Sequence, residues 1–128
     1  MAEEVKVTSA TGGTKGSKGT GYAMIPPEFM EALAAHYGDG ELKYPSTADG
    51  VPNFWLGYPM RLNIEAFNRH WYAWLRGEDQ IPDDGSDDPT AGNDHLLACA
   101  WHIIDMWRKQ GSEFDDRPAV RYASRGQG

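Results

Sequence analysis

Apolar residues recur at helical spacing in three stretches of this sequence, each ending at a glycine or a polar turn. The first stretch begins after Pro26-Pro27, and acidic residues follow in its first turn, as suits a helix N-terminus. The second runs from about residue 60 to Arg76, and its stripe consists of Met60, Ile64, Phe67, Trp71 and Trp74. The third runs from about Ala91 to Gln110, and its spine consists of Leu96, Ala100, Ile103 and Trp107.

These patterns predict an all-α fold, a small bundle of about three main helices with irregular N- and C-terminal tails. Residues 1–21 are rich in Gly, Lys, Ser and Thr, which is typical of a flexible tail. Residues 22–110 contain the periodic stretches and form the predicted helical domain. Residues 111–128 are polar and without periodicity, so we expect a C-terminal tail.

Two neighbouring polar residues of the second helix face different ways. His70 lies beside the apolar stripe, which predicts a partly desolvated histidine at the rim of the core. Arg69 lies on the far side, where it could pair with Glu65 or contact a phosphate. For Arg69, the pattern leaves both alternatives open.

The third helix carries a polar arc opposite its apolar spine, formed by Asp94, His95, His102 and Asp105. Such an arc is typical of the solvated face of an amphipathic helix. Alternatively, each His–Asp pair could supply one side of a metal site with help from the second helix. The single cysteine, Cys99, falls inside this helix and is expected to pack rather than react.

The segment that joins the second and third helices is strongly acidic. Seven acids lie between Glu78 and Asp94, without a lysine or arginine. The spacing of glycines and acids does not match an EF-hand loop. Mg²⁺ is commonly held by one or two protein carboxylates together with substrate phosphates. Glu78 and Asp79 at the helix end would therefore suffice as its protein ligands.

Composition narrows the possible partners. The formal net charge is −7, which argues against general nucleic-acid binding. One cysteine excludes an intrachain disulfide and is consistent with a reducing, cytoplasmic compartment, and no apolar run is long enough for a signal peptide or a membrane helix. Because a short chain rich in large aromatic residues leaves apolar surface uncovered, we expect a homo-oligomer.

Several short motifs, in this order, resemble those of a known family. They are Ile25-Pro26-Pro27-Glu28, Glu31, Gly40 before Lys43-Tyr44, Asn53, Trp55 with Gly57, Arg69-His70, Gly77-Glu78-Asp79, and His95 at the start of an apolar helix. Together they resemble the dATP/dGTP diphosphohydrolase N-terminal domain of phages and prophages, which is related in function to MazG-like nucleotide pyrophosphohydrolases. The resemblance covers about residues 15–107.

The resemblance implies cleavage of a purine deoxynucleoside triphosphate to its monophosphate and pyrophosphate in the cytoplasm of an infected bacterium. It implies Mg²⁺ or Mn²⁺ as the cofactor. Candidate catalytic residues are His70, Glu78, Asp79 and His95; candidate metal ligands are Glu31, Glu78, Asp79 and His95; candidate substrate contacts are Lys43, Tyr44, Asn53, Trp55 and Arg69. Two alternatives remain: a non-enzymatic phage accessory protein that binds a nucleotide, and an interaction module that binds a protein partner.

Overall fold

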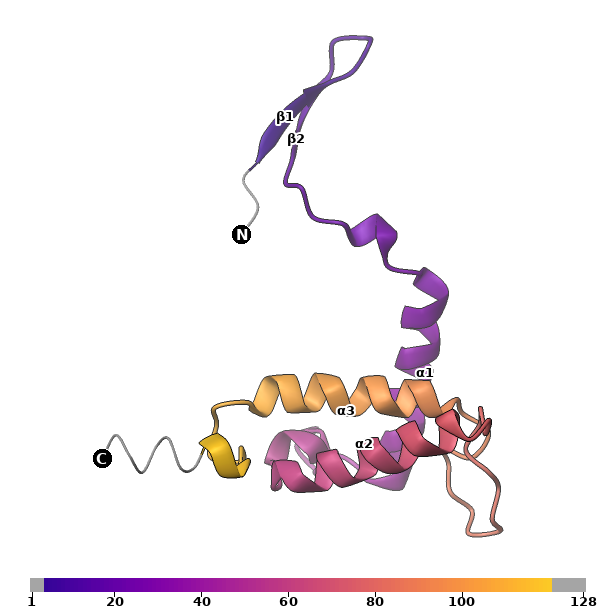
Figure 1. Cartoon of the computed structure of the whole chain (residues 1–128). Helices are drawn as coiled ribbons and strands as arrows, with labels where there is room; N and C mark the ends of the chain where they lie inside the picture. The colour runs from indigo at the N-terminus through magenta and orange to yellow at the C-terminus, as the bar shows by residue number, and fades with distance from the viewer. Residues whose placement is uncertain (1–3, 121–128) are drawn as a thin grey trace, which may run out of the picture. The chain divides into compact units, whose positions relative to one another are not determined.

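The structure, a computed structural model, describes residues 4–120, and it consists of two units, residues 1–30 and 31–128 (Figure 1). Residues 1–3 and 121–128, which belong to the two predicted tails, lie outside the described range. The elements in order are β1 (Val5–Thr8), β2 (Thr14–Ser17), η1 (Tyr22–Met24), α1 (Pro27–Lys43), η2 (Asn53–Leu56), α2 (Met60–Leu75) and α3 (His95–Lys109).

The first unit contains a two-stranded antiparallel hairpin within the segment that was expected to be a flexible tail. Strands β1 and β2 pair with Val5 opposite Ser17 and Thr8 opposite Thr14. At the turn, the backbone N–H of Ser9 donates to the carbonyl of Gly13 at 2.7 Å. The β-branched residues of the two strands favour pairing in a sheet. The many glycines of the segment made this preference hard to recognise in the sequence.

Helix α1 runs without interruption from Pro27 to Lys43, although two closely spaced glycines, Gly38 and Gly40, would be expected to interrupt a helix. Leu33 and His36 are its buried residues. The imidazole Nδ1 of His36 lies 3.0 Å from the amide nitrogen of Asn93, and that amide also donates to Asp39 at 2.9 Å. These tertiary contacts hold the last turns of α1 and offset the helical cost of the two glycines, roughly 1 kcal/mol each.

Helices α2 and α3 form an antiparallel pair, side by side along their length (Figure 1). Helix α3 begins at His95 rather than at the predicted Ala91. The preceding residues belong to the loop instead, because Ile81 N–H donates to the carbonyl of Asn93 at 2.8 Å and Gln80 forms a bridge with Asp94. Gly77, with φ 93°, ends α2 as expected of a C-cap glycine.

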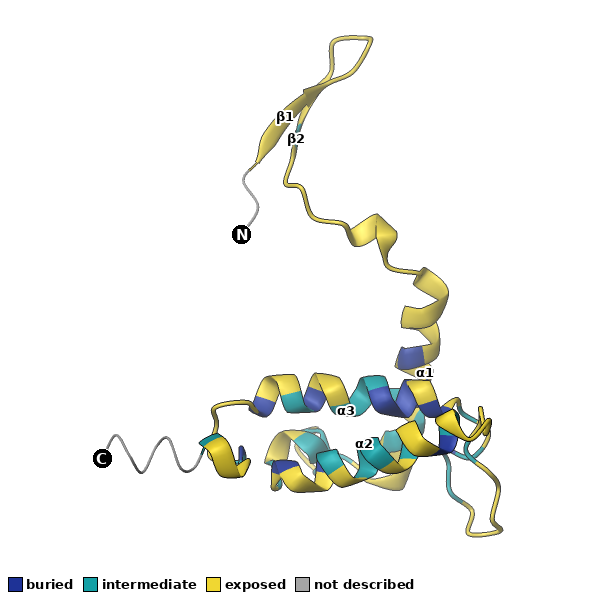
Figure 2. Ribbon diagram, in the orientation of Figure 1, coloured by how far each residue is buried: buried dark blue, intermediate teal, exposed yellow. Residues whose placement is uncertain are grey.

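The orientation of α3 is opposite to the prediction for its polar arc. His95 and Asp105 are buried and His102 is half-buried, whereas Leu96, Ile103 and Trp107 of the apolar spine are exposed (Figure 2). Apart from Asp94, which is exposed, the arc is therefore not a solvated face. Hydrophobic periodicity alone could not show this, because the polar residues are buried through specific partners on α2 and in the loop.

A buried polar cluster joins the first turn of α2 to the end of α3. Asn63 is fully buried, and its amide oxygen accepts from Lys109 Nζ at 2.9 Å. Lys109 also forms a buried ion pair with Asp105 at 2.9 Å. The Tyr58 hydroxyl donates to the same Asp105 oxygen at 2.8 Å. Since buried charges are stable only when paired and hydrogen-bonded, these partners explain how α3 can bury its polar side.

The segment after α3 is docked rather than a free tail as far as residue 117. The backbone N–H groups of Met60 and Arg61 donate to the Phe114 carbonyl at 2.9 Å and to Asp116 Oδ1 at 3.0 Å. They are among the first N–H groups of α2, which have no partners within the helix. The Phe114 ring occupies the space that a Cβ at Gly57 would need, and Gly57 has φ 87° and ψ 148°.

The fold-class prediction is confirmed: residues 4–120 are mainly helical, with three main helices and one small hairpin. In the part of the chain that the structure describes, none of the helices combines the length and apolar character needed to cross a bilayer.

Candidate functional site

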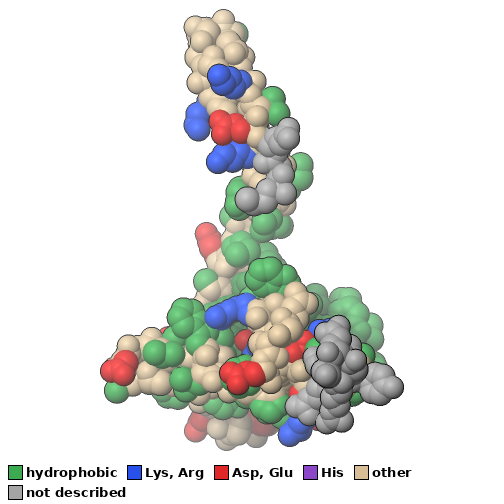
Figure 3. All heavy atoms as spheres, turned by 90° about the vertical axis from the view of Figure 1, so that its left-hand side faces the viewer, with side chains coloured by type: hydrophobic (Ala, Val, Ile, Leu, Met, Phe, Trp, Pro, Cys, Tyr) green, Lys and Arg blue, Asp and Glu red, His purple; other side chains and the backbone are tan. Residues whose placement is uncertain are grey.

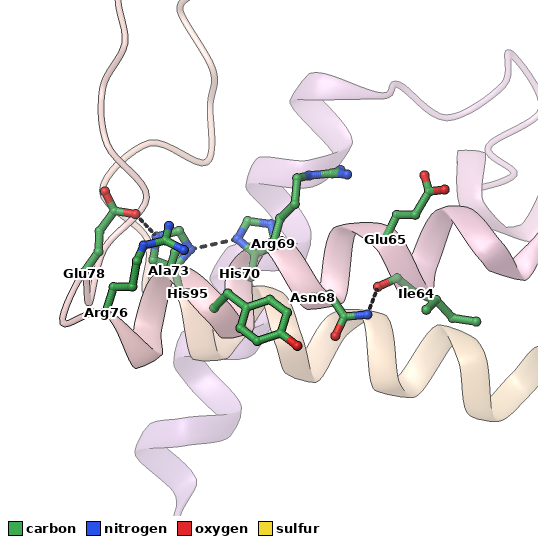
Figure 4. A pocket seen from close by; sticks show the side chains of 10 residues that line it. Ile64, Glu65, Asn68, Arg69, His70, Ala73, Arg76, Glu78 and His95 are labelled. Carbon is green, nitrogen blue, oxygen red and sulfur yellow. Dashed lines mark hydrogen bonds and ion pairs between the residues drawn. The ribbon is translucent and has the colours of Figure 1, made fainter.

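Three of the predicted site residues form one hydrogen-bonded chain at the junction of α2, the acidic loop and α3. The Nδ1 atoms of His70 and His95 lie 2.8 Å apart, and His95 Nε2 lies 2.9 Å from Glu78 Oε2 (Figure 4). His95 is buried, while the Glu78 side chain is 45% exposed. The antiparallel pairing of α2 and α3 places the end of one helix beside the start of the other, and this brings the three side chains together.

The hydrogen bonds determine where the protons of a neutral His95 lie. A carboxylate can only accept, so His95 Nε2 donates to Glu78. The Nδ1 of His95 then accepts from His70 Nδ1, and the lone pair of His70 is left on Nε2. Within residues 4–120 this Nε2 has no hydrogen-bond partner. The chain therefore leaves His70 with a free acceptor.

His70 and His102 are neutral at ordinary pH. Burial, helped by the neighbouring His95, lowers the pKa of His70 to about 4. Burial also lowers the pKa of His102 to about 4, and the two rings stack with centroids 6.2 Å apart. The amide of Asn63 approaches His102 Nδ1 at 3.1 Å, so this nitrogen accepts and its proton lies on Nε2.

A cavity of about 690 Å³ opens between α1, α2 and α3 beside this chain. That volume is in the range of small-molecule sites. One wall is aromatic: Phe54 meets Tyr37 and Trp101 edge-to-face, at centroid distances of 5.9 and 5.4 Å. Four of the five predicted substrate contacts line the cavity, namely Lys43, Tyr44, Asn53 and Arg69.

The two cationic side chains that line the cavity, Lys43 and Arg69, differ in their ion pairing. Lys43 Nζ forms an ion pair with Asp88 of the acidic loop at 3.1 Å. Arg69 is exposed and, among the described residues, is not ion-paired with Glu65. It lines both this cavity and the shallower hollow formed by the His70–His95–Glu78 chain, where Arg69 and Glu65 extend to the same side of α2 (Figure 4). Arg69 is thus placed between the cavity and the histidines.

Two predicted residues, Glu31 and Trp55, lie outside this arrangement, whereas Asp79 adjoins it through its backbone. Glu31 is exposed on α1 and lines neither hollow. Trp55 is 57% exposed and lies against Phe54 and the guanidinium of Arg108, outside the cavity wall. Asp79 contributes its backbone carbonyl, which accepts from the His95 N–H at 2.8 Å, while the residue itself is exposed.

The carboxylates near the histidines are better suited to a cation that binds together with substrate phosphates than to a cation held by protein ligands alone. Within residues 4–120, no group of three or more His, Cys, Asp or Glu side chains is placed to hold a metal ion. The predicted set of Glu31, Glu78, Asp79 and His95 is therefore not assembled as a cage. Glu78 and the neighbouring Asp79 offer exposed carboxylates, the number that Mg²⁺ commonly takes from protein when phosphates supply further oxygens.

Sequence reasoning missed several residues of the site. Tyr37, Phe54 and Trp101 form its aromatic wall, and His36 lines it with a pKa that burial lowers. Asn63, which positions His102, is recognisable in the sequence as a polar residue beside the apolar stripe of α2, although the pattern gives it no role. The other four carry no local signal, because they meet only through the packing of α1 on the helix pair.

The geometry defines a small helical domain with a cavity of small-molecule size that combines aromatic, cationic and imidazole side chains. The family model described as dATP/dGTP diphosphohydrolase, N-terminal, matches residues 9–117. The chain therefore belongs to this family. Neither the curated proteins nor the solved structures include a significant match to this sequence.

Proposed function

We propose that this protein binds a purine deoxynucleoside triphosphate in the cavity and hydrolyses it to the monophosphate and pyrophosphate. The observation that carries the proposal is the Glu78–His95–His70 chain at the edge of a cavity that Lys43 and Arg69 line. The family description, which names dATP/dGTP diphosphohydrolase, supports this substrate class.

Binding follows from the chemistry of the cavity walls. The flat faces of Tyr37, Phe54 and Trp101 suit a purine, because every base has a π-face for aromatic contact. Arg69 offers a planar pair of donors to phosphate oxygens. Lys43 adds a second positive charge once a phosphate competes with Asp88 for it.

Hydrolysis requires an oriented water, whose oxygen bonds to the α-phosphorus as the bond from phosphorus to the leaving pyrophosphate oxygen breaks. The proton of the water passes to the leaving pyrophosphate or to solvent. The free Nε2 of His70 accepts a hydrogen bond from that water, and Glu78 through His95 fixes the ring orientation and tautomer. The low pKa keeps His70 neutral, so the acceptor is present at pH 7. A base with a pKa of about 4 is weak, and the main contribution of His70 is therefore orientation.

A cation delivered with the triphosphate would be held by Glu78 and Asp79. When bound, it would neutralise charge on the phosphates. Mg²⁺ suits an oxygen donor set of this kind, and Mn²⁺ also tolerates the nearby imidazole of His95.

The test is to incubate the protein with dGTP or dATP and Mg²⁺ and to identify products by ³¹P NMR. We expect pyrophosphate and monophosphate in equal amounts. His70→Ala should abolish turnover with an unchanged far-UV circular dichroism spectrum. Turnover that survives in His70→Ala, or release of inorganic phosphate alone, would contradict the assignment.

A matched arginine pair tests the phosphate contact separately. Arg69→Met should raise KM at least about tenfold, since a charge-assisted bond to phosphate contributes roughly 1.5–3 kcal/mol. Arg61→Met is the control: Arg61 is also exposed on α2, but it lies beside Asp116 and lines neither hollow. Equal KM values in the two variants would remove Arg69 from the site.

A second candidate function is nucleotide binding without hydrolysis. It is favoured by the lack of an assembled group of three metal ligands among residues 4–120. Calorimetry that shows tight dGTP binding, together with no pyrophosphate release over long incubation, would support this alternative.

A further inference from the structure

Helices α2 and α3 leave a row of large apolar side chains wholly or partly open to solvent. We call it the outer face, and it consists of the half-buried Phe67 and the exposed Trp71, Leu96, Ile103 and Trp107. Trp71, Ile103 and Trp107 are 36%, 52% and 70% exposed. The same residues belong to the two apolar stripes that periodicity predicts to be buried. Figures 2 and 3 show exposed positions along both helices and hydrophobic side chains at the surface of the helical unit.

Both halves of the outer face lie on one side of the helix pair, away from the cavity. Leu62 and Trp101 line the cavity. Trp71 follows Leu62 by nine residues and Ile103 follows Trp101 by two, which places each of them roughly 160–180° around its helix from the cavity side. Beneath the face, Cys99 Sγ lies 3.8 Å from the Phe67 carbonyl and joins the two helices.

The spacing within the face indicates that its occupant is helical. Leu96, Ala100, Ile103 and Trp107 follow one another at intervals of four, three and four residues, the interval pattern of helix-on-helix packing. Phe67 and Trp71 stack at a centroid distance of 6.3 Å and extend the surface across α2. A copy of the same helix pair would present a matching ridge in a two-fold arrangement.

Area and charge also favour a second copy of this chain. With aromatic side chains of roughly 150–250 Å² each, the exposed parts of the face amount to on the order of 500 Å², most of the roughly 800 Å² per partner of a standard interface. None of its five residues is charged, although the chain carries a net charge of −7. Two acidic chains repel least where uncharged surfaces meet.

We propose that the outer face of α2 and α3 is the interface of a two-fold symmetric homodimer. The proposal is independent of the nucleotide site, which lies on the opposite side of the helix pair. In the dimer, the two apolar stripes are buried as their periodicity requires. Trp107, largely exposed in one chain, becomes a central anchor of the interface.

Sedimentation velocity and light scattering over a wide range of protein concentration test the proposal. We expect a dimer whose dissociation constant rises at least about 100-fold in Ile103→Glu, because two-fold symmetry places the new charge in the interface twice. Leu42→Glu is the matched control: Leu42 is 72% exposed on α1, off the outer face, and the substitution should leave the dimer unchanged.

A measurement on the unaltered protein covers the case in which Ile103→Glu does not fold. Iodide quenching of tryptophan fluorescence should decrease as concentration rises, since Trp71 and Trp107 become covered. A chain that stays monomeric with constant quenching would overturn the proposal and leave the face for a different partner. A folded Ile103→Glu variant that dimerises as tightly as the unaltered chain would also overturn it.

Discussion

Replacing Lys109 by Met removes one charge from the buried cluster while it keeps most of the apolar stem. The ammonium has three partners: Asp105 and Asn63, each at 2.9 Å, and the Tyr58 ring, with its centroid at 3.2 Å. In Lys109→Met, the carboxylate of Asp105, a residue only 3% exposed, keeps its donors from Tyr58 and Asn63 but has no cation. The substitution therefore leaves a buried negative charge without a counter-ion.

Removing one partner of a buried ion pair typically costs about 3–5 kcal/mol. Because two hydrogen bonds to Asp105 remain, we expect about 3 kcal/mol. This is a large part of the roughly 5–15 kcal/mol that stabilises a domain. In equilibrium urea unfolding, the midpoint should fall while the slope stays the same.

Two further variants separate burial from pairing. Lys43→Met breaks a lysine–aspartate pair of similar length, 3.1 Å, but the Lys43 side chain is 40% exposed, so its loss should cost less than about 1 kcal/mol. Adding Asp105→Leu to Lys109→Met removes the stranded carboxylate, and the double variant should be more stable than the sum of the single effects predicts. A cost below about 1 kcal/mol for Lys109→Met, or strict additivity, would refute the reasoning.

The remaining predictions concern pH and glycine. Burial lowers the pKa of His70 and His102 from 6.5 to about 4, so the unfolded chain takes up protons in this range that the folded chain does not. The free energy of unfolding should therefore be level above pH 6.5 and decrease as the pH falls toward 4; urea midpoints that do not change over this range would contradict it. Gly57→Ala should destabilise by more than about 2 kcal/mol, because its backbone conformation is nearly exclusive to glycine and Phe114 fills the Cβ position. Gly40→Ala in α1, where a Cβ meets nothing within 4 Å, should stabilise by about 0.5–1 kcal/mol, and thermal melts compare the two directly.

The sequence predicted the three helices well because their stripes are long and periodic. It failed on the orientation of α3, since periodicity places Ile103 and Trp107 inside and Asp105 outside. The structure reverses this through partners that are distant in the chain: Asp105 is 42 residues from Asn63, and His95 is 25 from His70. No local sequence pattern predicts such long-range pairings.

The candidate site could be predicted only in part, because sequence motifs give residue types but not their arrangement in space. The family motifs indicated Lys43, Tyr44, Asn53 and Arg69, and the structure places all four around one cavity. The motifs do not show three-dimensional direction, so Trp55 was included although it lies outside the wall. The proton positions on His70 and His95 follow only from the contacts of the two rings with each other and with Glu78.

The contacts of Phe114 and Asp116 with the start of α2 have a consequence for synthesis of the chain on the ribosome. A growing chain makes residue 60 long before residue 116, so the first turn of α2 is completed by groups that do not yet exist when the helix emerges. Helix α2 should therefore remain frayed at its N-terminus until synthesis has passed residue 117. A chain released at residue 110 should be cut by protease near Met60, and one released beyond residue 117 should resist.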